Sequence, residues 1–288
     1  MTAEPLETAY TLLAEDRFAE ALVQFDAALR LDPGDPVAAS GRAMANIGLD
    51  RPDEAIADYA QVIELAPEDF NAYFARGRLL EDQGKLREAI ADFKQVIGLE
   101  PDAKAAYLSR ARAYRKLRQY SLAVCDYQAV IDRDPADARP HLEIGRINGR
   151  QGDIEAAVGN FADAVELDPT SADAFYNLGV ATMRHGDTES AIFAYSEAIR
   201  LDPENASARL NRGSAYRAND QLDDALADYT RAIAMAPDDP RAFYNRGATH
   251  EDLDESEAAL ADFRAVLASD ADAKLKRRAR KRIARLRE

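Results

Sequence analysis

The stretch VELDPTSADAFYNLG, residues 165–179, has the pattern of one helix ending at a proline and a second helix beginning after it. Proline ends a helix because it lacks an amide hydrogen and clashes with the preceding turn. Two residues after Pro169 comes Ser171, a residue type favoured at the position just before a helix. A similar stretch, LDPENASARLNRG, occupies residues 201–213. The chain therefore repeats a helix–proline–helix hinge.

The hinge recurs with a period of 34 residues. The prolines at this spacing are Pro33, Pro67, Pro101, Pro135, Pro169, Pro203 and Pro237. An alanine stands twelve residues before each proline and an aromatic residue eight before it, as Ala157 and Phe161 do before Pro169. Ala259 and Phe263 mark an eighth repeat that lacks the proline. A fixed period of this length indicates stacked units of secondary structure.

Each repeat is predicted to contain two helices. In the sixth repeat, Phe175, Gly179 and Thr182 are spaced by four and three residues, which is the spacing of one helix face. Gly152 and its counterparts Gly84 and Gly186 are expected to turn the chain in the left-handed conformation that favours glycine. The expected N-terminal caps of the first helices are Asp35, Asp69, Asp137, Ser171, Asn205 and Asp239, with Ala103 as the exception.

This pattern resembles the tetratricopeptide repeat family, in which an aromatic residue, Leu-Gly, Tyr, Ala, Phe and Pro stand at set offsets. The matching residues of the sixth repeat are Phe175, Leu178-Gly179, Ala191, Tyr195, Ala198 and Pro203. The resemblance implies an all-α fold, a right-handed superhelical solenoid of antiparallel helix pairs, whose first helices line a concave groove. It covers eight repeats, predicted at residues 2–35, 36–69, 70–103, 104–137, 138–171, 172–205, 206–239 and 240–273.

The last segment, KLKRRARKRIARLRE at residues 274–288, differs from the rest in charge. It has nine Lys and Arg against one Glu, a net charge of +8, and the total of −15 therefore leaves −23 for residues 1–273. Leu275, Ala279, Ile283 and Leu286 form a helical stripe, which predicts a basic helix that caps the eighth repeat. Its outer face is suited to RNA, acidic lipid or acidic protein groups, or to shielding an acidic neighbour.

Residues that would carry chemistry are not grouped in the sequence. The three histidines fall at different repeat positions without Cys or His partners at ligand spacing, so we expect no metal site, and His141 and His250 should pack in the core. We also expect no catalytic site and no cofactor. Cys125 shares its position with alanines and is predicted to be packed; a single cysteine fits a reducing, cytoplasmic location. No segment is long and apolar enough to span a membrane.

Residues that the repeat does not need point to a ligand surface. Arg78, Arg112 and Arg146 share the ninth position of their repeats, and apolar residues at the fifth position predict hydrophobic pockets beside them. Equal positions in successive repeats align in a solenoid, so a basic ladder is expected. The predicted ligand-binding residues of the concave groove are Arg78, Arg112, Arg146, Arg115, Lys116, Arg150, Arg184, Arg217, Asn177, Asn211 and Asn245.

These residues predict a non-catalytic interaction adaptor that binds an acidic or acidic-aromatic peptide in the groove. One alternative is that the basic side chains only solvate a helix face and pair with acids such as Glu81 or Glu143. Others are an RNA- or ribosome-associated scaffold acting through the basic tail, and an oligomer that assembles through its end repeats. Aspartates of the second helices are expected to face solvent on the outer side: Asp58, Asp92, Asp126, Asp228 and Asp262.

Overall fold

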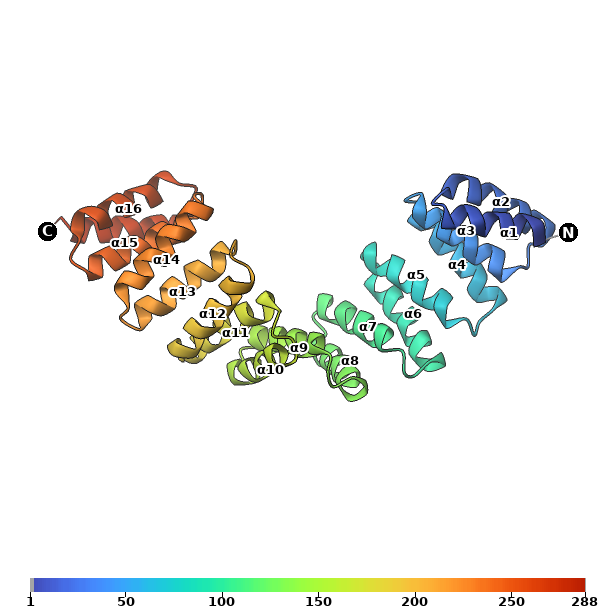
Figure 1. Cartoon of the computed structure of the whole chain (residues 1–288), viewed down its shortest axis with the longest axis horizontal. Helices are drawn as coiled ribbons and strands as arrows, with labels where there is room; N and C mark the ends of the chain where they lie inside the picture. The colour runs from blue at the N-terminus through green and yellow to red at the C-terminus, as the bar shows by residue number, and fades with distance from the viewer. Residues whose placement is uncertain (1–2, 288) are drawn as a thin grey trace. The chain divides into compact units, whose positions relative to one another are not determined.

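The computed structural model describes residues 3–287, so residue 2 of the first predicted repeat and residue 288 of the predicted tail lie outside the described part. In this part the chain is all helical, with 17 α-helices, and it divides into two compact units between Pro135 and Ala136 (Figure 1). The first unit contains α1 (Ala3–Ala14), α2 (Phe18–Leu31), α3 (Pro36–Gly48), α4 (Pro52–Leu65), α5 (Phe70–Asp82), α6 (Leu86–Leu99), α7 (Lys104–Lys116) and α8 (Tyr120–Arg133). The second contains α9 (Ala138–Gln151), α10 (Ile154–Leu167), α11 (Ala172–His185), α12 (Thr188–Leu201), α13 (Ala206–Ala218), α14 (Leu222–Met235), α15 (Pro240–Asp252), α16 (Ser256–Ala268) and α17 (Ala273–Arg285).

Within each unit the helices pack in tandem, each against the next in the chain. In the first unit, for example, α3 packs against α4 and α4 against α5. The same order holds in the second unit from α9 to α17. The helices thus form eight pairs followed by α17, the arrangement of a helical-repeat solenoid.

The predicted helix starts are confirmed. Asp35, Asp69, Asp137, Ser171, Asn205 and Asp239 each accept hydrogen bonds from backbone amides of the helix that follows, and Ala103 has no such bond. Gly84, Gly152 and Gly186 have φ angles of +75°, +89° and +97°, the left-handed region predicted for these turns. In other repeats, residues such as Asp50 and Arg118 adopt this conformation at the equivalent turn.

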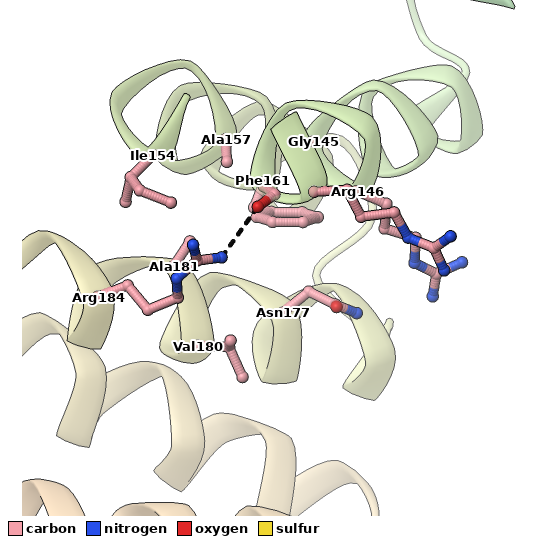
Figure 2. A pocket seen from close by; sticks show the side chains of 11 residues that line it. Gly145, Arg146, Ile154, Ala157, Phe161, Asn177, Val180, Ala181 and Arg184 are labelled. Carbon is pink, nitrogen blue, oxygen red and sulfur yellow. Dashed lines mark hydrogen bonds between the residues drawn. The ribbon is translucent and has the colours of Figure 1, made fainter. Parts of the chain in front are cut away.

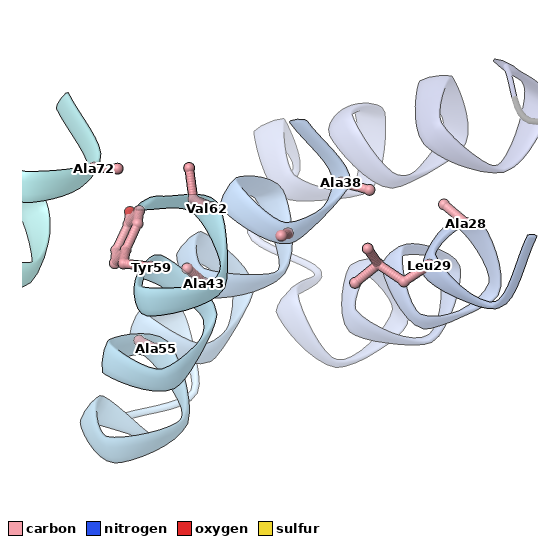
Figure 3. Close-up of a cluster of buried hydrophobic side chains, with 9 residues drawn as sticks. Ala28, Leu29, Ala38, Ala43, Ala55, Tyr59, Val62 and Ala72 are labelled. Atoms are coloured by element: carbon pink, nitrogen blue, oxygen red, sulfur yellow. The ribbon is translucent and has the colours of Figure 1, made fainter. Parts of the chain in front are cut away.

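The alanine and aromatic residues that recur in each repeat form the core. The eight alanines twelve residues before the hinge and the eight aromatic rings four residues later are all buried. Figure 3 shows one cluster, in which Tyr59 and Val62 of α4 pack with Ala43 of α3 and Ala72 of α5. Burial of each ring contributes about 1.5–3 kcal/mol to stability.

Close approach of the paired helices depends on glycine in most repeats. At Gly145 of α9, an added Cβ would lie 2.7 Å from the Phe161 ring of α10, well inside van der Waals contact. The ring therefore packs directly on the backbone of the partner helix. This explains why the Gly of the first helix and the aromatic residue of the second recur together.

The second-helix aspartates do not face solvent, so that prediction is wrong. Asp58, Asp92, Asp126, Asp228 and Asp262 are all buried, each with an exposed fraction of 4–5%. Each accepts hydrogen bonds from an arginine sixteen residues earlier, on the first helix of the same pair. The arginines are Arg42, Arg76, Arg110, Arg212 and Arg246.

These pairs have the geometry of strong charge-assisted hydrogen bonds. Arg110 donates from Nε to one oxygen of Asp126 at 2.8 Å and from Nη2 to the other at 2.7 Å. The hydrogen bonds to Asp126 raise the pKa of the Arg110 guanidinium, although partial burial acts in the opposite direction. A carboxylate at this position is tolerated in the interior because its charge is matched by arginine.

Cys125 is exposed rather than packed, so its predicted burial is also wrong. It lies two residues after the buried Ala123 of α8, and two residues turn a helix by about 200°. The position therefore points away from the core. Alanine at the same position of other repeats does not indicate burial.

Candidate functional site

A hollow of about 260 Å³ lies in the second unit, lined by residues of α9, α10 and α11 (Figure 2). Its polar lining consists of four predicted ligand-binding residues, Arg146, Arg150, Asn177 and Arg184. Its apolar lining includes Ile154, Ala157, Phe161, Val180 and Ala181. The hollow therefore combines guanidinium and amide groups with an apolar floor.

Arg184 is held across the hollow by the end of the neighbouring first helix. It stands in the last turn of α11, and its Nη1 donates to the Gly149 carbonyl of α9 at 2.9 Å (Figure 2). Carbonyls in the last turn of a helix have no partner within the helix, so this contact satisfies one of them. Neither Arg184 nor the exposed Arg150 forms an ion pair within residues 3–287. Both charges are thus available to an anion.

Arg146 and Asn177 already have partners at the edge of the hollow. Arg146 forms ion pairs with Glu143, at 2.7 Å, and with Asp173. Burial lowers the pKa of Arg146, but these two carboxylates outweigh it and the net shift is upward. The Asn177 amide donates to the Asp173 carbonyl at 2.7 Å and to its side chain at 2.9 Å. Asp173, more than half exposed, thus occupies the groups that a ligand carboxylate would contact.

A second hollow of about 230 Å³ in the same unit brings together Arg217 and Asn245. Arg217 is paired with Asp252 at 2.6 Å, and the Asn245 amide lies 3.3 Å from the Ser214 hydroxyl. Asn211 lines neither of the two hollows described here; its amide donates to the Tyr176 hydroxyl at 3.1 Å. This second hollow offers less uncompensated charge than the first.

In the first unit, the predicted basic residues are not all equivalent. Arg78 is exposed and forms no ion pair with the residues that the structure describes, and Arg115 is partly buried. Arg112 and Lys116 share Glu81, at 3.5 Å and 3.1 Å, and this carboxylate is almost fully buried. The positive charge of these two residues is therefore partly matched inside the protein. The ladder predicted across both units stays a prediction.

Of the carboxylates that pair with the predicted basic residues, only Glu81 and Glu143 were named from the sequence. The sequence nevertheless contains a signal for such pairs. Lys116 and Glu81 are 35 residues apart, as are Arg217 and Asp252. A separation of one repeat plus one residue therefore joins neighbouring first helices. A search for opposite charges at this spacing finds both pairs.

Histidines and carboxylates do not converge on a metal site in the described residues. No group of three or more His, Cys, Asp and Glu side chains in residues 3–287 is placed to hold a metal ion. His141 and His250 are partly buried, and their Nδ1 atoms lie 3.3 Å from Asp163 and 2.6 Å from Glu255. None of the helices described has the length and apolar character needed to cross a bilayer.

Comparison with known families decides what kind of repeat this is. Models of the tetratricopeptide repeat match the chain from residue 6 to residue 284, with matches at 6–70, 41–90, 74–138, 142–206, 181–240 and 212–284. The chain is a tetratricopeptide repeat protein. Members of this family act as protein-interaction scaffolds and are typically non-catalytic.

Solved tetratricopeptide repeat structures share the fold at low sequence identity. YrrB, described as having an unusual peptide-binding site, is 24% identical, with a TM-score of 0.55, over 64% of this chain and 95% of its own. MamA from Desulfovibrio magneticus RS-1 is 22% identical, with a TM-score of 0.55, over 59% of this chain and 96% of its own. The Cut9–Hcn1 complex of the APC/C matches 100% of this chain and 56% of its own at 18% identity, with a TM-score of 0.57. No curated protein matches the sequence.

Proposed function

We propose that this tetratricopeptide repeat protein is a scaffold that holds an acidic or acidic-aromatic peptide segment on its first helices. The hollow bordered by Arg146, Arg150, Asn177 and Arg184 is the docking point for the carboxylates. The remaining predicted residues extend the contact along each unit. The single cysteine, which precludes an internal disulfide, fits a cytoplasmic scaffold.

The observation that carries the proposal is the pair of guanidinium groups without carboxylate partners. Arg150 and Arg184 border the same hollow, and neither has an ion pair among the described residues. An arginine binds a carboxylate through two parallel hydrogen bonds, a geometry that a lysine does not provide. The rest of the protein is strongly acidic, so this local positive charge selects an anionic segment.

The apolar floor gives the second requirement for the ligand. Val180, Ala181 and Phe161 line the base of the hollow beside the arginines. A ligand side chain that is aromatic or aliphatic would bury apolar area there while its neighbouring carboxylates meet the guanidinium groups. The peptide-binding site named for YrrB supports a peptide as the class of ligand.

The test is a peptide array, followed by titration of the best binders against two variants. The site variant is Arg150→Gln/Arg184→Gln. The matched control is Arg231→Gln/Arg264→Gln, which removes the same charge from exposed arginines of α14 and α16. Each charge-assisted bond is worth about 1.5–3 kcal/mol, so the site variant should lose at least tenfold in affinity.

The control should bind like the wild type, and peptides with Asp or Glu beside an aromatic residue should dominate the array. Binding should also weaken as salt is raised, because exposed charges are screened. Equal affinity of the site variant and the control would contradict the proposal. So would an array in which acidic peptides are not enriched.

A further inference from the structure

The basic helix α17 has no apolar face left for another partner. Ala279 and Ile283 are buried in a cluster with Tyr244, Phe263 and Val266, and Leu275 and Leu286 pack against the same cluster. The helix therefore uses its apolar stripe to cover α15 and α16. What it presents to solvent is charge.

Most of this charge has no counterpart within the protein. The exposed basic residues are Lys274, Arg277, Arg278, Arg280, Lys281, Arg285 and Arg287. Of these, only Arg285 approaches a carboxylate within residues 3–287, with 3.8 Å to Glu251. Glu251 is already bound by Arg282 at 2.7 Å. The cations of α17 thus remain largely uncompensated within residues 3–287.

A hollow of about 400 Å³ at the same place has a purely cationic and aromatic lining. It is bordered by Tyr244 of α15 and by Arg278, Lys281, Arg282 and Arg285 of α17. The Arg278 guanidinium lies over the Tyr244 ring, 4.6 Å from its centroid, which holds that side chain in one orientation. A concave surface lined by one sign of charge concentrates the electrostatic potential.

We propose that α17 and this hollow bind the phosphodiester backbone of single-stranded nucleic acid, a function separate from peptide binding on the first helices. Six of the nine basic residues in the segment are arginines, whose planar guanidinium groups match phosphate oxygens. The exposed cations are distributed along the helix from Lys274 to Arg287. A flexible polyanion can follow such a surface, and neutralising several phosphates releases their counterions.

Other anionic partners fit these observations less well. A helix that lies on a membrane inserts its apolar face among the acyl chains, but the apolar face of α17 is buried against α15 and α16. An acidic peptide in the hollow would reach the four cations that line it but not the exposed cations outside it, which are Lys274, Arg277, Arg280 and Arg287. The acidic body, at −23, repels nucleic acid and restricts contact to this helix.

The experiment measures binding of the full chain to fluorescein-labelled 20-nucleotide single strands of mixed sequence, one RNA and one DNA. The site variant is Arg277→Gln/Arg280→Gln/Lys281→Gln, and the matched control is Arg87→Gln/Lys94→Gln/Arg264→Gln. All six residues are exposed and without ion pairs in the described chain, so both variants should fold and carry equal net charge. Circular dichroism and melting curves verify this.

The wild type and the control should bind both strands, with log affinity falling against log salt at a slope of about −3.5 for five phosphate contacts. The site variant should lose at least tenfold at 50 mM salt, and its slope should shrink by about two. Binding of the site variant equal to that of the control would overturn the proposal. The proposal would also be overturned if neither strand bound at 50 mM salt, even if phosphatidylserine vesicles or a poly-glutamate peptide bound instead.

Discussion

At the residue scale, the arginine–aspartate pairs follow an all-or-none rule. Five repeats have Arg on the first helix and Asp sixteen residues later on the second. In the other three repeats both are replaced: by Thr8 and Gln24 in the first, by Ile144 and Asn160 in the fifth and by Leu178 and Ala194 in the sixth. A half pair would leave a buried charge without a partner, whereas a pair of uncharged residues leaves none. This energetic cost explains why each repeat contains both charged residues or neither.

The rule predicts the behaviour of two variants of the fourth repeat. Asp126→Ala alone should lower the free energy of unfolding by about 3 kcal/mol, because Arg110 is left partly buried and unpaired. Arg110→Leu/Asp126→Ala copies the sixth repeat and should recover most of that loss. Urea unfolding curves of both variants provide the measurement. A double variant as unstable as the single one would refute the rule.

At the element scale, local sequence signals predicted helix caps and turns correctly. They did not predict which side of each second helix is buried. Asp35 and Gly152 could be assigned from sequence because a cap and a left-handed turn depend only on adjacent residues. Asp58 and Cys125 were misassigned because burial depends on which side of the second helix meets the first helix of the pair. The repeat period fixes that two helices pack, but the rotation of each helix comes from tertiary contacts.

The candidate site divides in the same way. Arg146 and Asn177, which repeat positions assigned to one predicted ligand surface, line one hollow. The repeat positions did not reveal that Asp173 occupies both groups, nor that Asp252 neutralises Arg217. Asp173 and Asp252 each lie one repeat after the arginine that they pair with, so their effect on that arginine depends on side-chain reach across helices. The repeat position of a charged residue therefore predicts the surface on which it lies. Whether its charge is already paired depends on the neighbouring side chains.

The contribution of one such local feature, the helix cap at Asp239, to stability can be measured. The Asp239 side chain accepts a hydrogen bond from the Arg241 amide at 2.9 Å and pairs with the Arg241 guanidinium, which lowers the pKa of the carboxyl. Asp239→Ala should destabilise the protein by about 1 kcal/mol at pH 7. A lowered pKa in the folded state means that the contribution is complete above the ordinary Asp pKa and disappears as pH falls through the folded value.

Chemical unfolding of wild type and Asp239→Ala from pH 7 to pH 2 checks this expectation. The stability difference between them should narrow toward the acid end of the range. A difference that is constant with pH would mean that the carboxylate charge does not contribute to the cap.

At the scale of the whole molecule, α17 completes the last repeat. Removing residues 274–288 would expose Tyr244 and Val266, which are buried beside Ala279 and Ile283. The truncated chain should melt at a lower temperature or self-associate, because a repeat without a neighbour exposes an apolar face. Light scattering and thermal melting test this. A monomeric truncation with an unchanged melting curve would show that α17 does not stabilise the repeats.

The central claim is that a peptide binds in the hollow between α9, α10 and α11. Its most direct test is site-specific photocrosslinking, with a photoreactive phenylalanine at Val180 in the floor of the hollow or at Phe193, an exposed position on the second helix α12. With an acidic-aromatic peptide from the array, the Val180 protein should crosslink strongly. Excess unlabelled peptide or Arg150→Gln/Arg184→Gln should abolish the crosslink, and the Phe193 protein should not react. Crosslinking at Phe193 but not at Val180 would contradict the account.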